Sequence, residues 1–311
     1  MKASAWRVLI RALLLGLSML VPVSHAQSSF GGALGVSGVA SVFFRASDGL
    51  ELHYYQAGPQ DSATTVLLLP GWSMPASLWS AQWKALAARH RVLALDPRGQ
   101  GLSEFPAPLD EPVWSIDRRA DDVRELLRSV DKASKSRLIL VGWSLGALEL
   151  LHALQRDPAL AARVAGVVLV DSSVGEGEPG APSGFRAALQ ADRRAALESF
   201  IRAIFVQPQP ENRLNELLQG ALRLPLQTSL DLFPSDVPRA YWRNAVRGLA
   251  APLLYVVTPQ FAQQAALLEA ARMQAGRPVQ TAVFESAGHA LFVDEAEAFN
   301  TLLEEFLLTL D

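Results

Sequence analysis

Apolar residues gather in short runs along most of this chain, and the segments between the runs repeat their apolar residues at helical spacing. Runs without alternation of apolar and polar residues are typical of strands buried on both faces of a sheet. The pattern predicts strands at residues 41–45, 51–55, 64–69, 91–96, 137–140, 165–170, 252–257 and 279–284. It predicts helices at residues 78–90, 117–131, 145–157, 261–274 and 295–310. Strands that alternate with helices of this length favour a mostly parallel sheet with helices on both faces.

The alternation stops in the middle of the chain, where the pattern predicts helices without strands. Helical pieces are expected at residues 185–204, 211–224 and 237–246, and several prolines separate them. A helical stretch inside an alternating fold indicates a cap that is inserted into one continuous core. The predicted organisation is an α/β core at residues 41–174 and 249–311 with a helical cap at residues 175–248.

The first residues follow the pattern of a secretory signal peptide. Basic residues precede an apolar run at 12–23, and Ser24-His25-Ala26 places small residues at the positions that determine cleavage. The run is about twelve residues long, which is short for a membrane span, so we expect cleavage after Ala26; an uncleaved anchor is the alternative. The predicted signal peptide is 1–26, and residues 27–40 are expected to form a flexible lead-in. The mature protein is expected in the periplasm or outside the cell, without stable membrane association.

The composition narrows the chemistry further. Of the 311 residues, 28 are Lys or Arg and 31 are Asp or Glu, which leaves a net charge of −3 and no basic surface that would indicate nucleic-acid binding. The chain contains no cysteine. Disulfides, thiolate metal sites and a cysteine nucleophile are therefore excluded. No other pattern points to a metal or an organic cofactor, so none is expected.

The junction between a predicted strand and a predicted helix carries the first sign of chemistry. The strand ends in Gly142-Trp143-Ser144-Leu145-Gly146, and the helix follows directly. A serine between two glycines at such a junction is a nucleophile elbow, whose turn is too tight for side chains at the glycine positions. The turn exposes the serine hydroxyl and directs the first N–H groups of the helix toward the group that the serine attacks. Ser144 is therefore the candidate nucleophile.

A serine nucleophile needs a base, and His289 is the candidate. It lies in a loop of small residues (286–290) between the last predicted strand and the last predicted helix. Loops at the carboxyl ends of parallel strands are where ligands and catalytic groups collect. His53, His90 and His152 fall in a predicted strand or in predicted helices. We expect structural roles for these three.

Together these motifs resemble the α/β-hydrolase superfamily, and the likeness extends over residues 41–310. Besides the elbow and Ala287-Gly288-His289, it rests on Leu69-Pro70-Gly71-Trp72 after the third strand and on Asp96-Pro97-Arg98-Gly99-Gln100-Gly101-Leu102-Ser103 after the fourth. The elbow and the cap are most similar to small carboxylesterases, including pimeloyl-ester esterases, and to non-haem haloperoxidase-like members. The resemblance implies an α/β-hydrolase fold, which is a mostly parallel eight-stranded sheet with helices on both faces and a helical cap insertion.

The resemblance also implies an oxyanion hole made by the backbone N–H groups of Leu145 and Trp72. Family members usually have His-Gly where this chain has Pro70-Gly71, so the resemblance implies the oxyanion hole but does not fix the exact path of this loop. Trp72 and Trp143 are expected to line the substrate pocket. A role as packed aromatic residues is equally compatible with the sequence.

The acid of a catalytic triad is harder to place. The family normally has it just after the seventh strand, where this chain has Thr258-Pro259-Gln260-Phe261. Asp171 comes directly after the sixth predicted strand, a position that some branches of the superfamily use. Because neighbouring strands lie about 4.8 Å apart, an acid at Asp171 is displaced by one strand only. Asp171 is therefore the expected triad acid; a capping role for it, or a Ser–His dyad, is the alternative.

Four further acidic residues have weaker links to the site. Glu176 and Glu178 follow Asp171 closely and are further candidates for the acid. By resemblance, Asp96 is expected to pin the turn after the fourth strand. Asp294, five residues after His289, is expected to be the N-cap of the last helix.

The sequence thus predicts an exported serine hydrolase that cleaves a small or medium carboxylic ester through an acyl-enzyme on Ser144. His289 is expected to act as general base and acid, and Asp171 to hold its imidazole. Perhydrolase, lactonase or C–C hydrolase activity at the same triad is an alternative, and so is a non-catalytic protein that binds a small molecule in a hydrolase-like pocket. The expected partner is a small-molecule ester, with no nucleic acid, metal or cofactor.

Overall fold

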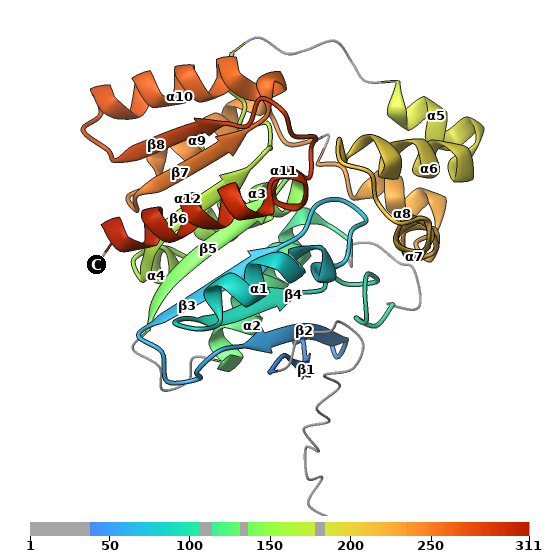
Figure 1. Cartoon of the computed structure of the whole chain (residues 1–311), viewed down its shortest axis with the longest axis horizontal. Helices are drawn as coiled ribbons and strands as arrows, with labels where there is room; N and C mark the ends of the chain where they lie inside the picture. Colours follow the sequence, from blue (N-terminus) through green and yellow to red (C-terminus); the bar gives the residue numbers. More distant parts are fainter. Residues whose placement is uncertain (1–37, 106–113, 131–135, 178–183, 235, 311) are drawn as a thin grey trace, which may run out of the picture.

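One sheet of eight strands forms the centre of the molecule (Figure 1). The structure, a computed structural model, describes residues 38–105, 114–130, 136–177, 184–234 and 236–310. The predicted signal peptide and residues 27–37 of the predicted lead-in lie outside the described residues. The strands are β1 (Ala40–Arg45), β2 (Glu51–Ala57), β3 (Thr64–Leu69), β4 (Arg91–Leu95), β5 (Arg137–Trp143), β6 (Val164–Val170), β7 (Leu253–Val257) and β8 (Val279–Val283).

The strands follow the order β1-β2-β4-β3-β5-β6-β7-β8 across the sheet. β2 runs antiparallel to β1 and to β4, and the other neighbours are parallel. β3, β4 and β7 are buried at every residue, as their unbroken apolar runs predict. The sheet therefore needs helices on both of its faces.

Helices cover those two faces (Figure 1). On one face lie α1 (Ser80–Leu86) and α12 (Ala296–Thr309). On the other lie α2 (Ile116–Val130), α3 (Leu145–Arg156) and α10 (Ala262–Gln274). Short elements complete the core: η1 (Ala76–Trp79), α4 (Pro158–Ala161), η2 (Pro259–Phe261) and α11 (Leu291–Asp294). Successive residues of a strand point to opposite faces of the sheet, so Leu68 belongs to one hydrophobic cluster and Leu67 and Leu69 belong to the other.

Four cap helices stand together beyond one end of the sheet (Figure 1), and they are α5 (Phe185–Ala191), α6 (Arg193–Ala203), α7 (Glu211–Leu222) and α8 (Leu226–Asp231). The sequence predicts one helix over 185–204, but Asp192 leaves the helical conformation (φ −149°, ψ 95°) and accepts from the Ala195 N–H at 3.0 Å. The chain therefore makes two helices there, and α8 is an addition to the predicted pattern. With this cap above the two-faced sheet, the predicted fold class is confirmed.

The last helix of the predicted cap segment lies elsewhere. α9 (Arg239–Gly248) contributes Trp242 and Val246 to the hydrophobic cluster that also holds α3 and α10. It contacts α3 and α10, and Figure 1 shows it apart from α5–α8. Its packing follows from its strong amphipathic pattern, since one apolar side needs a core to cover it.

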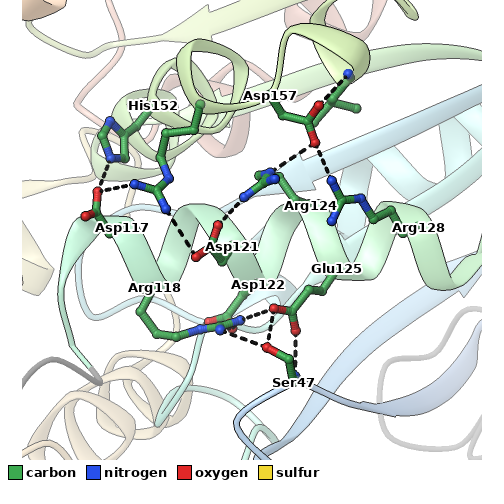
Figure 2. A network of polar contacts seen from close by, with 12 residues as sticks. Ser47, Asp117, Arg118, Asp121, Asp122, Arg124, Glu125, Arg128, His152 and Asp157 are labelled. Carbon is green, nitrogen blue, oxygen red and sulfur yellow. Dashed lines mark hydrogen bonds and ion pairs between the residues drawn. The ribbon is translucent and has the colours of Figure 1, made fainter.

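A network of ion pairs ties α2 to its surroundings (Figure 2). Arg118 pairs with Glu125 at 2.7 Å, and Glu125 also accepts from the Ser47 hydroxyl at 2.7 Å, in the turn between β1 and β2. Further along the helix, Arg128 pairs with Asp157 at 2.7 Å. Asp157 directly follows α3, so the network holds the far end of α3 against α2.

The register of the sheet brings three chain segments to one edge. At the carboxyl ends, Trp143 of β5 pairs with Val170 of β6, and Val170 pairs with Val256 of β7. The residues that follow these strands are therefore neighbours in space. They include Ser144 and Asp171.

Candidate active site

Ser144 occupies a strained turn between β5 and α3. Its φ of 54° and ψ of −119° lie in a region that residues with side chains rarely adopt. A Cβ on Gly142 would lie 2.7 Å from the backbone of Ala147, and one on Gly146 would lie 2.5 Å from the carbonyl oxygen of Pro70. Both positions therefore exclude every residue but glycine. The turn has the geometry that a nucleophile elbow requires.

Asp171 and His289 meet at the same edge of the sheet. His289 Nδ1 lies 2.6 Å from Asp171 Oδ2. The carboxylate is 1% exposed, whereas 25% of the histidine side chain is accessible to solvent. A buried carboxylate bonded to Nδ1 holds the ring in the tautomer whose Nε2 can accept a proton. The structure thus joins two side chains that are 118 residues apart in the sequence.

Thr258 directly follows β7, at the position where the sequence shows no acid. Its backbone N–H and its hydroxyl both donate to Asp171 Oδ1, at 2.6 and 2.8 Å. Asp171 has a φ of 44°, and its own N–H donates to Val256 O at 2.8 Å. Because Oδ1 is held by Thr258, Oδ2 is left to His289. The sequence predicted no role for Thr258; its one sign is a residue with a hydroxyl donor at the position where the family normally has the acid.

Trp143 connects the histidine loop to the elbow. Its indole N–H donates to the carbonyl oxygen of His289 at 2.8 Å, and the two ring centroids are 5.1 Å apart. Because Trp143 immediately precedes Ser144, this contact ties the histidine loop to the end of β5 that leads into the elbow. The indole is 1% exposed and also packs on Phe292. It serves as a buried packing element.

The loop after β3 lies directly against the elbow. A Cβ on Gly71 would lie 3.0 Å from Ser144 Cβ. The next residue, Trp72, turns its side chain into the cap, where the indole N–H donates to Ser229 O at 2.9 Å and the ring stacks on Phe233 at 5.0 Å. The backbone of this loop and the first turn of α3 therefore approach Ser144 from two sides.

Glu176, the second described candidate for the acid, has a different partner. Its carboxylate is buried and is bound by the Arg247 guanidinium at 2.5 and 2.6 Å. Glu178 lies outside the described residues. Burial, and then the carboxylates of Asp171 and Glu176, raise the pKa of Tyr255. The Tyr255 phenol stays protonated and donates to Ser172 O at 2.6 Å, which supports the loop that carries Asp171.

The predicted capping role of Asp294 is wrong. The N-cap of α12 is Glu295, which makes no side-chain capping bond. Asp294 is instead the last residue of α11, and its Oδ2 accepts from the Gly288 N–H at 2.8 Å. Asp294 therefore bonds the residue directly before His289. Its spacing from His289 in the sequence did not predict this contact.

A second Ser–His–Asp chain joins β1 and β2 to the end of β4, toward the β1 edge of the sheet. Ser41 Oγ lies 2.7 Å from His53 Nε2, and His53 Nδ1 lies 2.7 Å from Asp96 Oδ2. His53 and Asp96 are both fully buried. Asp96 also accepts from the N–H groups of Ala76 and Leu102, at 2.7 and 3.0 Å. Asp96 therefore pins its turn, as predicted.

The remaining described histidines have partners on neighbouring helices. His152 bonds to the Tyr241 hydroxyl at 2.6 Å and to Asp117 at 2.5 Å (Figure 2 shows the Asp117 contact). The hydrogen bond from His152 lowers the pKa of Asp117. His90 lies 3.7 Å from Glu304. Structural contacts thus account for both histidines.

The part of the chain that the structure describes contains neither a candidate metal site nor a helix that could span a membrane. In those residues no group of three or more His, Asp or Glu side chains could hold a metal ion. None of the described helices has the length and apolar content needed to cross a membrane.

Comparison with known proteins places this geometry in context. Residues 66–302 match the family model described as "Alpha/beta hydrolase family". RutD of Variovorax paradoxus (strain S110), a protein provisionally named a carbamate hydrolase, is 40% identical to this chain over 124 residues. That match covers 40% of this chain and 43% of RutD, less than half of the relative's length.

Two further similarities cover nearly the whole of the other protein. The pimeloyl-[acyl-carrier protein] methyl ester esterase of Vibrio cholerae serotype O1 is 23% identical over 262 residues, which is 81% of this chain and 97% of that protein. The crystal structure of bromoperoxidase from Bacillus anthracis superimposes with a TM-score of 0.72 at 21% identity, over 86% of this chain and 99% of that one. The structural likeness concerns the fold.

Proposed function

The chain belongs to the alpha/beta hydrolase family, and from this premise we propose that it is a serine hydrolase that cleaves a small or medium carboxylic ester through an acyl-enzyme on Ser144. The observation that carries the proposal is the 2.6 Å contact between His289 Nδ1 and the buried Asp171 carboxylate, at the sheet edge where the strained Ser144 lies. The sequence similarity to a methyl ester esterase over 97% of that protein supports the ester as substrate.

In the proposed acylation, His289 Nε2 takes the proton of the Ser144 hydroxyl while Oγ attacks the ester carbonyl. The imidazole becomes positively charged, and the Asp171 carboxylate stabilises this charge and keeps the ring in place. Asp171 itself keeps no spare acceptor on Oδ1, because Thr258 donates to it twice. His289 then gives its proton to the leaving alcohol.

The tetrahedral intermediate places a negative charge on the former carbonyl oxygen. We assign its stabilisation to the backbone N–H groups of Leu145, the first residue of α3, and Trp72, in the loop that touches Ser144. Loss of one such donor typically costs about 10²–10³ in kcat. Water activated by His289 then attacks the acyl-enzyme and returns Ser144 to its free state.

The cap supplies the aromatic surroundings of the proposed site. Trp72 packs its indole against three phenylalanines of the cap region, Phe185, Phe200 and Phe233, at centroid distances of 5.4, 5.5 and 5.0 Å. Apolar walls with a few directed polar groups are typical of small-molecule pockets. They favour an ester with an apolar acyl or alcohol group.

A fluorophosphonate probe tests the proposed nucleophile. We expect one phosphonate on Ser144 of the folded protein, located by peptide mass spectrometry, and no label after unfolding in urea. Absence of labelling at Ser144 would favour a non-catalytic binder. Turnover of p-nitrophenyl esters of graded acyl length, with a homoserine lactone and a peracid assay in parallel, would then separate esterase activity from lactonase or perhydrolase activity.

Export remains a second part of the proposal. The basic start, the apolar run at 12–23 and the small residues before position 27 support cleavage after Ala26. Expression of the full chain in a Gram-negative host should yield a periplasmic protein whose N-terminal sequence begins at Gln27. A full-length protein in the membrane fraction would show an uncleaved anchor instead.

A further inference from the structure

The histidine loop is bonded to the cap through Asp294. Asp294 Oδ2 accepts from the N–H groups of Gly288 and Val206, both at 2.8 Å, and Oδ1 accepts from the N–H of Gln207 at 3.1 Å. Val206 and Gln207 lie in the connection between the cap helices α6 and α7. One carboxylate thus joins the residue before His289 to the cap.

A second contact joins the other side of the histidine to the same cap segment. The N–H of Ala290 donates to Ile204 O at 2.8 Å. A Cβ on Gly288 would lie 2.7 Å from that same carbonyl oxygen, so the loop and the cap are in direct backbone contact. The residues on both sides of His289 are therefore attached to the end of α6.

We propose that Asp294 is a positioning residue, which makes the placement of the His289 imidazole depend on the seating of the cap. The inference rests on the proposed function, because it concerns the base of that reaction. When the cap is seated, residues 288 and 290 are held from the cap side while Asp171 and Trp143 hold the ring and the carbonyl of His289 from the core side. When the cap moves, only the core side remains.

The chemistry of the three donors explains why a carboxylate stands at this position. An ionised carboxylate offers two acceptor oxygens and no donor, so it can accept all three N–H groups. These are charge-assisted bonds, which are shorter and stronger than neutral ones. An asparagine amide would keep one acceptor oxygen and would turn an NH2 group toward backbone N–H groups, so at least one bond would be lost.

The proposal predicts a specific kinetic change in Asp294→Asn. Misplacement of a catalytic group by up to about 1 Å costs as much as 100-fold in rate. We expect kcat for p-nitrophenyl acetate to fall about 10- to 100-fold, with KM within about threefold, because the affected contact matters for the transition state more than for binding. The rate of Ser144 phosphonylation should fall by the same factor, and Asp294→Glu should recover part of both.

Asp192→Ala is the matched control. Asp192 is also an aspartate that bonds backbone in the cap, at the start of α6, but its partner is Ala195 and not the histidine loop. It should weaken the cap and leave kcat within about twofold. A similar fall of kcat in both variants, or an unchanged kcat in Asp294→Asn, would overturn the proposed role.

Hydrogen exchange separates this inference from the proposed function. In Asp294→Asn the amides of segments 204–207 and 286–292 should exchange faster together, whereas in Asp192→Ala only the start of α6 should change. If the wild-type protein neither hydrolyses esters nor labels at Ser144, the proposed function fails while the coupled exchange still tests the link. If exchange of the two segments is uncoupled in an active wild-type enzyme, the link fails alone.

Discussion

The His53–Asp96 and His289–Asp171 pairs of the molecule are both hydrogen-bonded, and the proposed function uses only one of them. In the chain Ser41–His53–Asp96 both contacts measure 2.7 Å, and the histidine is fully buried. In the other arrangement, the side chain of His289 is 25% exposed above a buried Asp171. The His–Asp contacts, at 2.7 and 2.6 Å, would not by themselves distinguish the two.

The backbone around each serine makes the difference. Ser41 lies in the regular strand β1 and pairs with Tyr55 of β2, so no helix begins directly after it. Ser144 has a φ of 54° and directly precedes α3. It also lies against the loop after β3, where a Cβ on Gly71 would lie 3.0 Å from Ser144 Cβ. A nucleophile needs donors for the developing oxyanion as well as a base. The buried chain around His53 supplies hydrogen bonds for stability instead.

The largest difference between the two arrangements is expected when the serines are exchanged for alanine. Ser144→Ala should lower kcat for a p-nitrophenyl ester by about 10⁴- to 10⁶-fold, because the nucleophile is lost. Ser41→Ala should change kcat by less than about twofold. Initial-rate kinetics on both purified variants measure the contrast. Equal losses would mean that Ser41 takes part in the reaction.

The two aspartates provide the next contrast. Asp171→Asn should lower kcat by about 10⁴-fold, since the amide no longer secures the reactive tautomer of His289. Circular dichroism should show an intact fold. If Asp171→Asn turns over the same ester at the wild-type rate, the acid has been assigned to the wrong residue.

Removal of the buried histidine should affect stability and spare activity. His53→Phe leaves one oxygen of Asp96 without its 2.7 Å partner, and hydrogen bonds to charged groups contribute about 1.5–3 kcal/mol. We expect the free energy of unfolding in urea to fall by about 2 kcal/mol. The kcat of the folded variant, measured well below its Tm, should stay near that of the wild type. A large loss of kcat there would give His53 a catalytic role.

The smallest effect concerns Asp117, the exposed partner of the buried His152. The hydrogen bond from His152 lowers the pKa of Asp117 in the folded protein. A lowered pKa stabilises the fold above the ordinary value of about 4, and this stabilisation is lost as the pH falls through the folded value. Because Asp117 is largely exposed, Asp117→Asn should cost less than about 1 kcal/mol at pH 7. Urea unfolding at pH 7 and pH 3 should show a smaller difference at pH 3.

Parts of the site could be predicted because they depend on local backbone geometry. Gly142 and Gly146 exclude side chains through contacts with residues at most five positions away, or with the adjoining loop after β3. The unbroken apolar runs of β3 and β7 likewise reflect burial that each strand needs on both faces. Asp171 as partner of His289 followed from the order of parallel strands and a family resemblance together.

Other features depend on segments that are distant in the sequence. Asp294 was assigned to the helix that it precedes, whereas two of its three donors lie in the cap, 87 and 88 residues earlier. Asp192 interrupts a segment whose apolar spacing favours one helix, because its side chain bonds the backbone of the next turn. The pattern of apolar residues along the sequence predicts neither the contacts of Asp294 nor that of Asp192.

The sequence by itself determined the alternation of strands and helices, the elbow at Ser144 and the position of His289 at the carboxyl edge of the sheet, because each follows from local conformation and strand order. Only the tertiary structure decided which partners the polar side chains find. In the folded chain Thr258 bonds to Asp171, the cap backbone bonds to Asp294, and Ser41 bonds to His53. A hydrogen bond depends on positions in space, and residues far apart in the chain reach these positions only after folding.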